Sequence, residues 1–410
     1  MTRRVVIVGA SAAGLAAAEA LRSGGYDGAL TLIGEEQRLP YDRPPLSKQI
    51  LDGTWEPERV MLRDERELGK IGAELLLGHT AVGLDTTSRR VLLDHGGSVG
   101  YDGLVIATGV APRRLPDADL AGIHLLRTLD DALTLRAQLL ARPKVAVVGA
   151  GFLGAEVAAV ARQMGLEVAI VDPQPPMSRQ FGQQIGALIA ALHRDNGVTL
   201  RSGVGVSRFV ATDGRVVGVE LADESVIDAD LVIVAVGAAP ATGWLADSGL
   251  TLANGVECDA FCEAAPGIYA AGDVASWYNP HFGVRMRVEH RTNATEQAIA
   301  VAGNLLGDTR PFAPIPYCWT DQYDAKIQAH GIFPSGAETL VLSGNLSERQ
   351  FVVGYCHKGR VVGVLGWNMP RGVRELRRLV VERAPRKATT VRNPIFDSRN
   401  TATRPGRVRT

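Results

Sequence analysis

Two stretches of the chain repeat one pattern of apolar and polar positions. Each begins with an apolar run that suits a buried strand, breaks at closely spaced glycines, and continues with apolar residues at helical spacing. The first stretch, RRVVIVGASAAGLAAAEAL, starts at Arg3, and the second, PKVAVVGAGFLGAEVAAVA, starts at Pro143. Their first glycines, Gly9 and Gly149, lie 140 residues apart. This internal repeat predicts two similar strand, turn and helix units.

Each predicted unit continues with further apolar runs. A second run follows the helix at residues 29–33 in the first unit and at residues 167–171 in the second. A closing run, at residues 104–109 and at residues 231–237, ends in glycine in both units. All-apolar runs of this length suit parallel strands that are buried on both faces. The pattern therefore predicts one parallel sheet for each unit.

The pattern changes from about residue 321. A strand-like stretch, VVGYCHKGRVVGVLGWN, precedes a helical pattern over residues 373–381, which predicts a separate α+β domain. Residues 386–410 contain seven basic side chains and one acid, and we expect a flexible basic tail there. The predicted fold class is α/β, with two Rossmann-like domains followed by a C-terminal α+β domain.

The composition is that of an ordinary folded protein, with 410 residues of which 46% are hydrophobic and 21% charged. The 44 basic and 44 acidic side chains balance, which argues against nucleic-acid binding through overall charge. Glycines interrupt the N-terminal apolar stretch, and no apolar run reaches the roughly 18 residues of a membrane span, so we expect neither a secretory signal nor a span. The chain has four cysteines, Cys258, Cys262, Cys318 and Cys356. They are too few for a disulfide framework and lack CxxC spacing, which favours a reducing cytosol.

The glycine-rich turns predict nucleotide binding. A helix N-terminus presents unpaired N–H groups and a positive dipole end, both of which suit a pyrophosphate, and glycine lets the backbone approach it. The second turn has the complete pattern of Gly149, Gly151 and Gly154, whereas Ser11 replaces the middle glycine in the first turn. One such turn is weak evidence, but two copies, each followed by an acid, predict that two dinucleotides bind.

The acid after the second strand of each unit indicates which dinucleotide binds. Glu35 and Asp172 stand near the spacing of a carboxylate that binds ribose. Asp172 would repel a 2′-phosphate, which favours NADH over NADPH, although Arg179 nearby leaves NADPH open. The second dinucleotide is most economically FAD, because flavin can take a hydride from nicotinamide.

The order of several segments resembles the oxygenase-coupled ferredoxin reductases, which are FAD-containing relatives of glutathione reductase. The resemblance covers residues 3–380 and includes VVIVGASAAG, LPYDRPPLSK, LVIATG, VVGAGFLGAEVAA, GIYAAGDVA and PYCWTDQY. It implies a discontinuous FAD-binding domain over residues 1–112 and 246–320, with an NADH-binding domain inserted over residues 113–245. Residues 321–385 would form the C-terminal domain.

The resemblance also implies roles for individual residues. Lys48 would lie beside the reactive edge of the flavin and stabilise negative charge there, and Glu156 would pair with it. Asp273 would bind the ribityl chain, Arg127 would line the flavin or its phosphates, and Phe152 would lie near the nicotinamide. Each residue also has a structural alternative. The alternatives are a solvated lysine for Lys48, an acid that suits a helix dipole for Glu156, a helix cap for Asp273, an exposed arginine for Arg127 and a core aromatic ring for Phe152.

The remaining cofactor-binding residues follow from the same comparison of positions. Arg291 departs from the resemblance, because it replaces a small or apolar residue, and it would either change the flavin potential or point outward. The residues expected around FAD are Gly9, Ser11, Ala13, Gly14, Glu35, Arg43, Lys48, Val82, Arg127, Asp273, Arg291 and Trp319. The residues expected around NADH are Gly149, Gly151, Phe152, Gly154, Glu156, Asp172 and Gly237.

The sequence carries no redox-active cysteine pair after the first turn and no metal-ligand spacing, so disulfide reductase chemistry and a metal are not expected. His290 follows an acid but is expected to be structural, because hydride transfer needs no side-chain base. The expected activity is therefore hydride transfer from NADH to FAD, followed by single-electron transfer to a two-iron two-sulfur ferredoxin.

That ferredoxin would serve a haem monooxygenase or a ring-hydroxylating dioxygenase. Acidic ferredoxins would meet a local basic patch, and the candidate residues lie on the C-terminal helix: Arg371, Arg374, Arg377 and Arg378. A solvated helix face explains these arginines equally well. Two other functions stay open, a flavin redox sensor that resembles apoptosis-inducing factor and a rubredoxin reductase.

Overall fold

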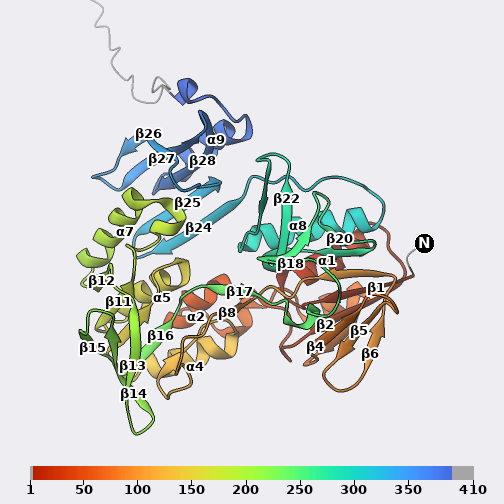
Figure 1. The fold of residues 1–410 in the computed structure, drawn as a ribbon, viewed down its shortest axis with the longest axis horizontal. Coiled ribbons are helices and arrows are strands. Elements are labelled where there is room, and N and C mark those ends of the chain that lie inside the picture. Colours follow the sequence, from red (N-terminus) through yellow and green to blue (C-terminus); the bar gives the residue numbers. More distant parts are fainter. Residues whose placement is uncertain (1–2, 390–410) are drawn as a thin grey trace, which may run out of the picture. The chain divides into compact units, whose positions relative to one another are not determined.

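The computed structural model describes residues 3–389 and divides the chain into two compact units, residues 1–324 and 325–410 (Figure 1). Two parallel sheets with covering helices lie in the first unit, and an antiparallel sheet with one long helix lies in the second. The predicted α/β class with two nucleotide-binding sheets is confirmed. No helix within residues 3–389 is long and apolar enough to cross a membrane.

The first sheet combines strands from distant parts of the sequence. Its central strands are parallel, and β1 is flanked by β2 and β7. Val5, Val6 and Ile7 of β1 are fully buried, as expected for a strand covered on both faces. In spatial order the strands are β20 (Glu263–Ala265), β21 (Ile268–Ala270), β7 (Gly103–Ile106), β1 (Arg4–Val8), β2 (Ala29–Gly34) and β3 (Glu74–Leu77).

Two helices pack together in this part of the molecule. Helix α1 (Ala12–Ser23) follows β1 directly, and α8 (Arg291–Leu305) comes from far along the chain, yet the two are in extensive contact. The buried face of α1 consists largely of alanine, which allows the close approach. A Cβ atom on Gly272 would lie 3.1 Å from that of Ala13 and 3.5 Å from that of Ala294, so the N-terminal ends of α1 and α8 meet beside Gly272.

The second sheet repeats the arrangement within a continuous stretch of chain. All its pairings are parallel, and the buried strand β10 lies between β11 and β16. In spatial order the strands are β12 (Thr199–Ser202), β11 (Val168–Asp172), β10 (Val145–Val148), β16 (Leu231–Val234) and β9 (Ile123–His124). The associated helices are α4 (Leu129–Leu139), α5 (Phe152–Gln163), α6 (Ser178–Phe181) and α7 (Gln183–Asp195).

The closing strands β7 and β16 are shorter than the sequence predicts. The apolar runs were expected to extend to residues 109 and 237, but β7 ends at Ile106 and β16 ends at Val234. Gly109 and Gly237 adopt positive φ angles of 70° and 93°, so the chain turns there. Two short antiparallel strands follow these turns and pair with each other: β8 (Val110–Pro112) and β17 (Ala238–Pro240).

Smaller elements complete the first unit. They include the helices α2 (Gln49–Asp52) and α3 (Glu65–Ile71), the 3-10 turns η1 (Pro44–Ser47) and η4 (Gly272–Val274), and the strand β24 (Tyr317–Gln322). One small sheet consists of β4 (Ala81–Asp85), β5 (Arg90–Leu93) and β6 (Ser98–Gly100). A second consists of β13 (Val206–Thr212), β14 (Arg215–Leu221) and β15 (Val226–Asp228). A third consists of β18 (Leu252–Ala253), β19 (Gly255–Cys258), β22 (Ala275–Asn279) and β23 (Val284–Met286). Of these, η1, η4, β4 and β24 bear residues of the candidate site.

The second unit is an antiparallel sheet packed against one helix, which fits the predicted α+β domain. Its strands are β25 (Ala325–Gly331), β28 (Arg360–Trp367), β27 (Gln350–His357) and β26 (Glu338–Asn345). Helix α9 (Pro370–Val381) buries Val373, Leu379 and Val380 against this sheet. Most of the predicted basic tail, from residue 390 onward, lies outside the described residues.

Candidate functional site

Glycine is required at the first and last positions of both glycine-rich turns. Gly9 and Gly149 have φ angles of 115° and 102°, which L side chains rarely adopt. A Cβ atom on Gly14 would lie 1.8 Å from the carbonyl oxygen of Gly9, and one on Gly154 would lie 2.0 Å from that of Gly149. These glycines therefore let each helix begin tightly against its own turn.

The middle positions of the two turns tolerate a side chain. A Cβ atom on Gly151 would meet only the side-chain nitrogen of Gln180, at 3.5 Å. Its counterpart Ser11 is the N-cap residue of α1, but its side chain makes no capping hydrogen bond. The structure accommodates serine there, and the space beside both turns suits a ligand that approaches the backbone.

The first turns of α1 and α5 lack the side-chain caps that begin two other helices of the unit, and the first turns of α7 and α8 lack them too. Helices α3 and α4 begin with complete capping boxes, built on Asp64 and Thr128. Helices α1 and α5 have neither a side-chain cap nor an acid in the first turn. Their N–H groups are therefore left for an anionic ligand, and a dinucleotide pyrophosphate fits both turns.

The two predicted ribose acids stand at the ends of matching strands. Glu35 follows β2 and is exposed, while its neighbour Glu36 is engaged with Arg43 at 2.6 Å. Asp172 ends β11 and accepts hydrogen bonds from the amides of Ala150 and Gln174, at 2.9 and 2.8 Å. Asp172 thus also braces its glycine-rich turn, a role that the sequence did not reveal.

Lys48 and Glu156, far apart in sequence, form a buried ion pair. The Nζ atom of Lys48, at the start of α2, lies 2.8 Å from Oε2 of Glu156 in α5. The side chains are only 13% and 8% exposed, so water screens the pair weakly. The predicted pairing is present, and a solvated surface lysine does not describe Lys48.

Two further residues hold Glu156. Ser47 donates a hydrogen bond to Oε2 at 2.6 Å, and Thr320 donates one to Oε1 at 2.9 Å. All three side chains are buried, so hydrogen-bond donors of the protein replace the water that would otherwise solvate the carboxylate. Sequence reasoning missed Ser47 and Thr320, although each is next to a residue that it singled out, Lys48 and Trp319.

Asp273, Arg127 and Arg43 form a charged group near the first turn. The Nη2 atom of Arg127 lies 3.9 Å from Oδ2 of Asp273, and Arg43 donates to the carbonyl oxygen of Arg127 at 2.6 Å. Burial raises the pKa of Asp273, and the guanidinium of Arg127 opposes that rise. A Cβ on Gly272 would lie 3.1 Å from that of Ala13, so Asp273 stands beside the start of α1.

The remaining predicted residues lie on the same parts of the fold. Arg291 begins α8, forms an ion pair with Asp42 at 2.5 Å and donates to Thr295, so its side chain does not simply point into solvent. Val82 on β4 is 52% exposed, as a residue free to contact a ligand would be. The ring of Trp319 on β24 stacks on that of Tyr317, with centroids 5.8 Å apart.

Phe152 lies at the start of α5 between two other rings. Its centroid is 5.7 Å from that of Phe181 and 5.8 Å from that of His290, both in edge-to-face geometry. Burial lowers the pKa of His290 to about 4, so its imidazole is neutral at neutral pH. Phe152 and His290 therefore join the two nucleotide-binding parts, whereas the sequence alone left Phe152 between a core and a binding role.

The four cysteines are free and buried. Burial raises the pKa of the Cys262 and Cys318 thiols to about 12, which keeps them protonated and unreactive.

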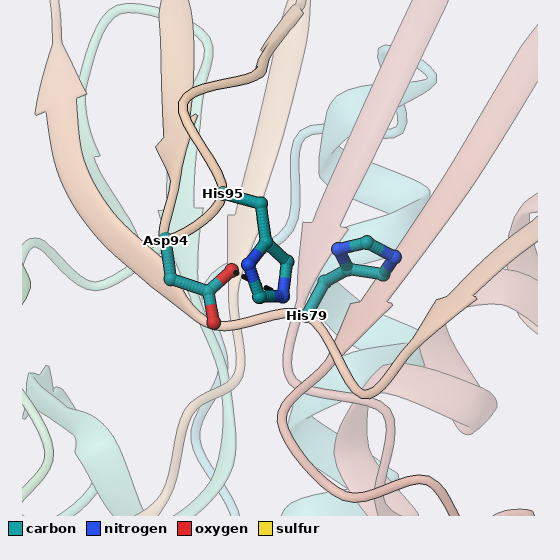
Figure 2. Close-up of side chains that lie close together, drawn as sticks. All are labelled: His79, Asp94 and His95. Atoms are coloured by element: carbon teal, nitrogen blue, oxygen red, sulfur yellow. Dashed lines mark ion pairs between the residues drawn. The ribbon is translucent and has the colours of Figure 1, made fainter.

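The structure also gathers three possible metal ligands that sequence spacing did not indicate. His79, Asp94 and His95 come from two turns, and their nearest ligand atoms lie within 4.8 Å of one another (Figure 2). The two histidines are separated in sequence and meet only because β4 and β5 pair. No role in the nucleotide-binding site follows from this group.

Comparisons with known proteins agree with this geometry. A family model described as pyridine nucleotide-disulphide oxidoreductase matches residues 3–298, and a reductase C-terminal model matches residues 317–402. Rhodocoxin reductase from Rhodococcus erythropolis is 35% identical and covers 96% of this chain and 93% of its own. The ferredoxin–NAD(+) reductase component of the anthranilate 1,2-dioxygenase system from Burkholderia cepacia is 37% identical, over 92% of this chain and 93% of its own.

A solved structure is similar over nearly the whole chain. The covalent putidaredoxin reductase–putidaredoxin complex has a TM-score of 0.88 and 32% sequence identity, covering 93% of this chain and 94% of the matched chain.

Proposed function

The chain belongs to the pyridine nucleotide-disulphide oxidoreductase family, and we propose that it is an FAD-dependent ferredoxin–NAD(+) reductase. NADH donates a hydride, and a two-iron two-sulfur ferredoxin receives single electrons. When bound, FAD supplies the chemistry that links these two steps, because it accepts an electron pair and releases the electrons one at a time.

FAD is assigned to the first parallel sheet. The tight turn at Gly9, the uncapped start of α1 and the exposed acid Glu35 suit its pyrophosphate and ribose. Asp273 and Arg127 supply polar groups beside that turn. Residues 1–112 and 246–320 form the domain that holds FAD in this proposal.

NADH is assigned to the second parallel sheet, over residues 113–245. The turn at Gly149 and the uncapped start of α5 suit its pyrophosphate, and Asp172 suits its adenosine ribose. The carboxylate would repel the extra phosphate of NADPH. Residues 321–385 form the third domain of the proposal.

The observation that carries the proposal is the buried pair of Lys48 and Glu156. It joins a segment of the FAD-binding part to α5 of the NADH-binding part, where the two nucleotides must meet for a hydride to pass. The ammonium group of Lys48 stabilises negative charge that develops beside it, and Glu156 keeps the ammonium in place.

The ferredoxin is assigned as partner from the relatives. The curated relatives include reductase components of dioxygenase systems, and the similar solved structure is a complex with putidaredoxin. By this comparison the ferredoxin would serve a ring-hydroxylating dioxygenase or a haem monooxygenase. Helix α9 offers four exposed arginines to an acidic partner: Arg371, Arg374, Arg377 and Arg378.

We assign the protein to the cytoplasm. The support is chemical, since all four cysteines are free and buried and none is paired in a disulfide.

Reconstitution of the electron-transfer chain tests the proposal. The purified protein is assayed for cytochrome c reduction with NADH and a panel of two-iron two-sulfur ferredoxins, with a rubredoxin and no carrier as comparisons. The expected result is a bound chromophore that proves to be FAD, and turnover that depends on a ferredoxin. Rubredoxin-dependent turnover alone, or a long-lived reduced protein without acceptor turnover, contradicts the proposal.

A further inference from the structure

Glu156 is the end point of a hydrogen-bond chain that runs into the interior of the first unit. Thr320 and Gln322 lie two residues apart on β24, and the amide nitrogen of Gln322 donates to Thr320 Oγ1 at 3.1 Å. The other end of the Gln322 amide is 3.0 Å from Nε2 of His193, in α7. Thr320, Gln322 and His193 are at most 1% exposed. These bonds are therefore shielded from bulk solvent.

The direction of every bond follows from the carboxylate. An ionised Glu156 can only accept, so the Thr320 hydroxyl must donate to it. The Thr320 oxygen then accepts from the nitrogen of Gln322, which also donates to Met177 Sδ at 3.4 Å. The carbonyl oxygen of Gln322 therefore faces His193, whose Nε2 must carry the hydrogen.

The histidine at the far end completes the order. Burial lowers the pKa of His193 to about 4, so the ring is neutral at neutral pH and has one hydrogen. Because Nε2 carries that hydrogen, Nδ1 accepts from the Tyr323 hydroxyl, 3.2 Å away. All donors thus point the same way, toward Glu156, and bonds aligned in this manner strengthen one another.

We propose that Thr320 and Gln322, with His193 behind them, are positioning residues that fix the Glu156 carboxylate and thereby hold Lys48 at the hydride-transfer site. The inference rests on the proposed function. Glu156 Oε2 already binds Ser47 and Lys48, so Thr320 is the side chain that orients the opposite oxygen. Without Thr320 the carboxylate of Glu156 can rotate, and the ammonium group of Lys48 that is bound to it moves as well.

The first test is spectroscopic and is read from the wild-type protein. In the holoprotein labelled with [15N]histidine, the His193 ring should show a protonated Nε2 and a bare Nδ1 between about pH 6 and pH 8. The signal is assigned by its loss in His193→Gln. The opposite tautomer, or titration of this ring near its ordinary pKa, overturns the inference.

The second test separates positioning from stability. Thr320→Val should slow flavin reduction by NADH about tenfold in stopped-flow experiments, with the Kd for NADH little changed. Thr320→Ser should restore the rate, and Gln322→Leu should slow it in the same direction. Thr199→Val, in an exposed position of β12, is the matched control.

The two proposals fail in different ways. If Thr320→Val loses thermal stability but reduces its flavin at the wild-type rate, Thr320 is merely structural and the positioning inference is wrong. If NADH does not reduce the wild-type protein at all, the proposed function is wrong.

A separate observation concerns His79, Asp94 and His95. His79 follows β3, and the other two residues occupy the turn between β5 and β6. Backbone bonds brace both segments, from His79 to Gly34 and from Asp94 to Thr80, each 3.0 Å long. Figure 2 shows the three side chains converging from these turns.

His79 lacks the partner that a buried polar atom needs. Its Nδ1 atom is buried and has no hydrogen-bond partner among the described residues. The His95 ring stands edge-to-face beside it, with centroids 5.5 Å apart, and Nε2 of His95 is 3.6 Å from Oδ1 of Asp94. A cation between the three groups would satisfy the orphan nitrogen.

We propose that these residues form a binding site for Zn²⁺ with two imidazoles, one carboxylate and a fourth position for water. Two nitrogen ligands favour zinc over magnesium. Ligand atoms around tetrahedral zinc lie about 3.4 Å apart, so the site must contract slightly. Gly96 and Gly97 allow this, because both face open space in the turn that bears Asp94 and His95.

Calorimetric titration of the chelator-treated holoprotein with Zn²⁺ tests this site. One zinc should bind, at least about tenfold more weakly in His95→Ala and Asp94→Asn, both substitutions in an exposed turn. His357→Ala is the control, and Mg²⁺ should produce no binding heat. Unchanged zinc binding in His95→Ala, or no zinc binding by the wild type, overturns the proposal.

Discussion

The Nζ atom of Lys48 lies 2.8 Å from Oε2 of Glu156, although 108 positions separate the two residues in sequence. Lys48 is the residue between η1 and α2, and Glu156 belongs to the first turns of α5. Leu46 and Ile50, on either side of Lys48, are buried in the core around the second parallel sheet, so the pair lies beside that sheet. A buried ion pair that loses one member leaves an uncompensated charge, so each residue depends on the other.

Lys48→Ala should slow the reduction of bound flavin by NADH at least about tenfold, because the ammonium that stabilises developing negative charge is gone. FAD should stay bound, since the turn at Gly9 is unaltered. Stopped-flow absorbance measures the rate, and Lys70→Ala on the exposed side of α3 is the control. Equal rates in the wild type and Lys48→Ala would remove Lys48 from the catalytic site.

Two substitutions in the second glycine-rich turn should differ in their effect on folding. Gly154→Ala should destabilise the protein strongly, because the new Cβ would lie 2.0 Å from the Gly149 oxygen. Gly151→Ala should fold normally, since its Cβ has room, but should raise the KM for NADH about tenfold by blocking the approach of the pyrophosphate. Thermal unfolding and steady-state kinetics distinguish them. A normal KM in Gly151→Ala would argue that the nucleotide binds elsewhere.

Asp172→Ala should lower the preference for NADH over NADPH, measured as the ratio of the two kcat/KM values, by about tenfold or more. The carboxylate no longer repels a 2′-phosphate, and Arg179, now 3.9 Å from it, becomes available to bind one. Adding Arg179→Ala should remove the gain with NADPH. An unchanged ratio in Asp172→Ala refutes the ribose role. Part of the loss with NADH will come from the turn, because Asp172 also accepts from the Ala150 amide.

Charge reversal on α9 tests the docking of the ferredoxin. The double variant Arg374→Glu, Arg378→Glu should raise the KM for ferredoxin several-fold and weaken its dependence on salt, since both side chains are exposed. Reduction of ferricyanide by NADH should not change. Arg66→Glu, on the exposed side of α3, serves as the matched control. A wild-type KM in the double variant means that these arginines are only a solvated helix face.

The stability of the protein should fall as the medium is acidified below about pH 6.5. His193 has a pKa of about 4 in the folded state, so between that value and its ordinary 6.5 the unfolded chain binds more protons. This one residue should account for about 2 kcal/mol between about pH 7 and pH 5. Denaturant unfolding of the wild type and His193→Gln at both pH values measures the difference. The same pH dependence in both proteins would show that His193 is not buried in the neutral form.

Local patterns made much of the fold predictable. The glycine-rich turns sit between a strand and a helix, so a short stretch of sequence determines the geometry at Gly9 and Gly149. The ends of the closing strands were predicted less well. Apolar residues continue beyond Ile106 and Val234, and periodicity alone cannot show that the chain leaves the sheet there to form β8 and β17.

The contacts around Glu156 could not be read from the sequence. Thr320 is 164 positions away from Glu156, and Gln322 is 129 positions away from His193, so only the tertiary fold brings them together. The cluster of His79 and His95 has the same origin, since it depends on how two turns meet. The roles of Lys48, Asp273 and the other proposed ligands came from a resemblance and remain predictions.

Anaerobic titration of the purified protein with NADH tests the central claim most directly. One equivalent of NADH per bound FAD should bleach the flavin absorbance, and deuterium at the transferred position of the nicotinamide should slow that bleaching. A protein that carries no flavin after purification and reconstitution, or whose flavin absorbance NADH leaves unchanged, would contradict the account.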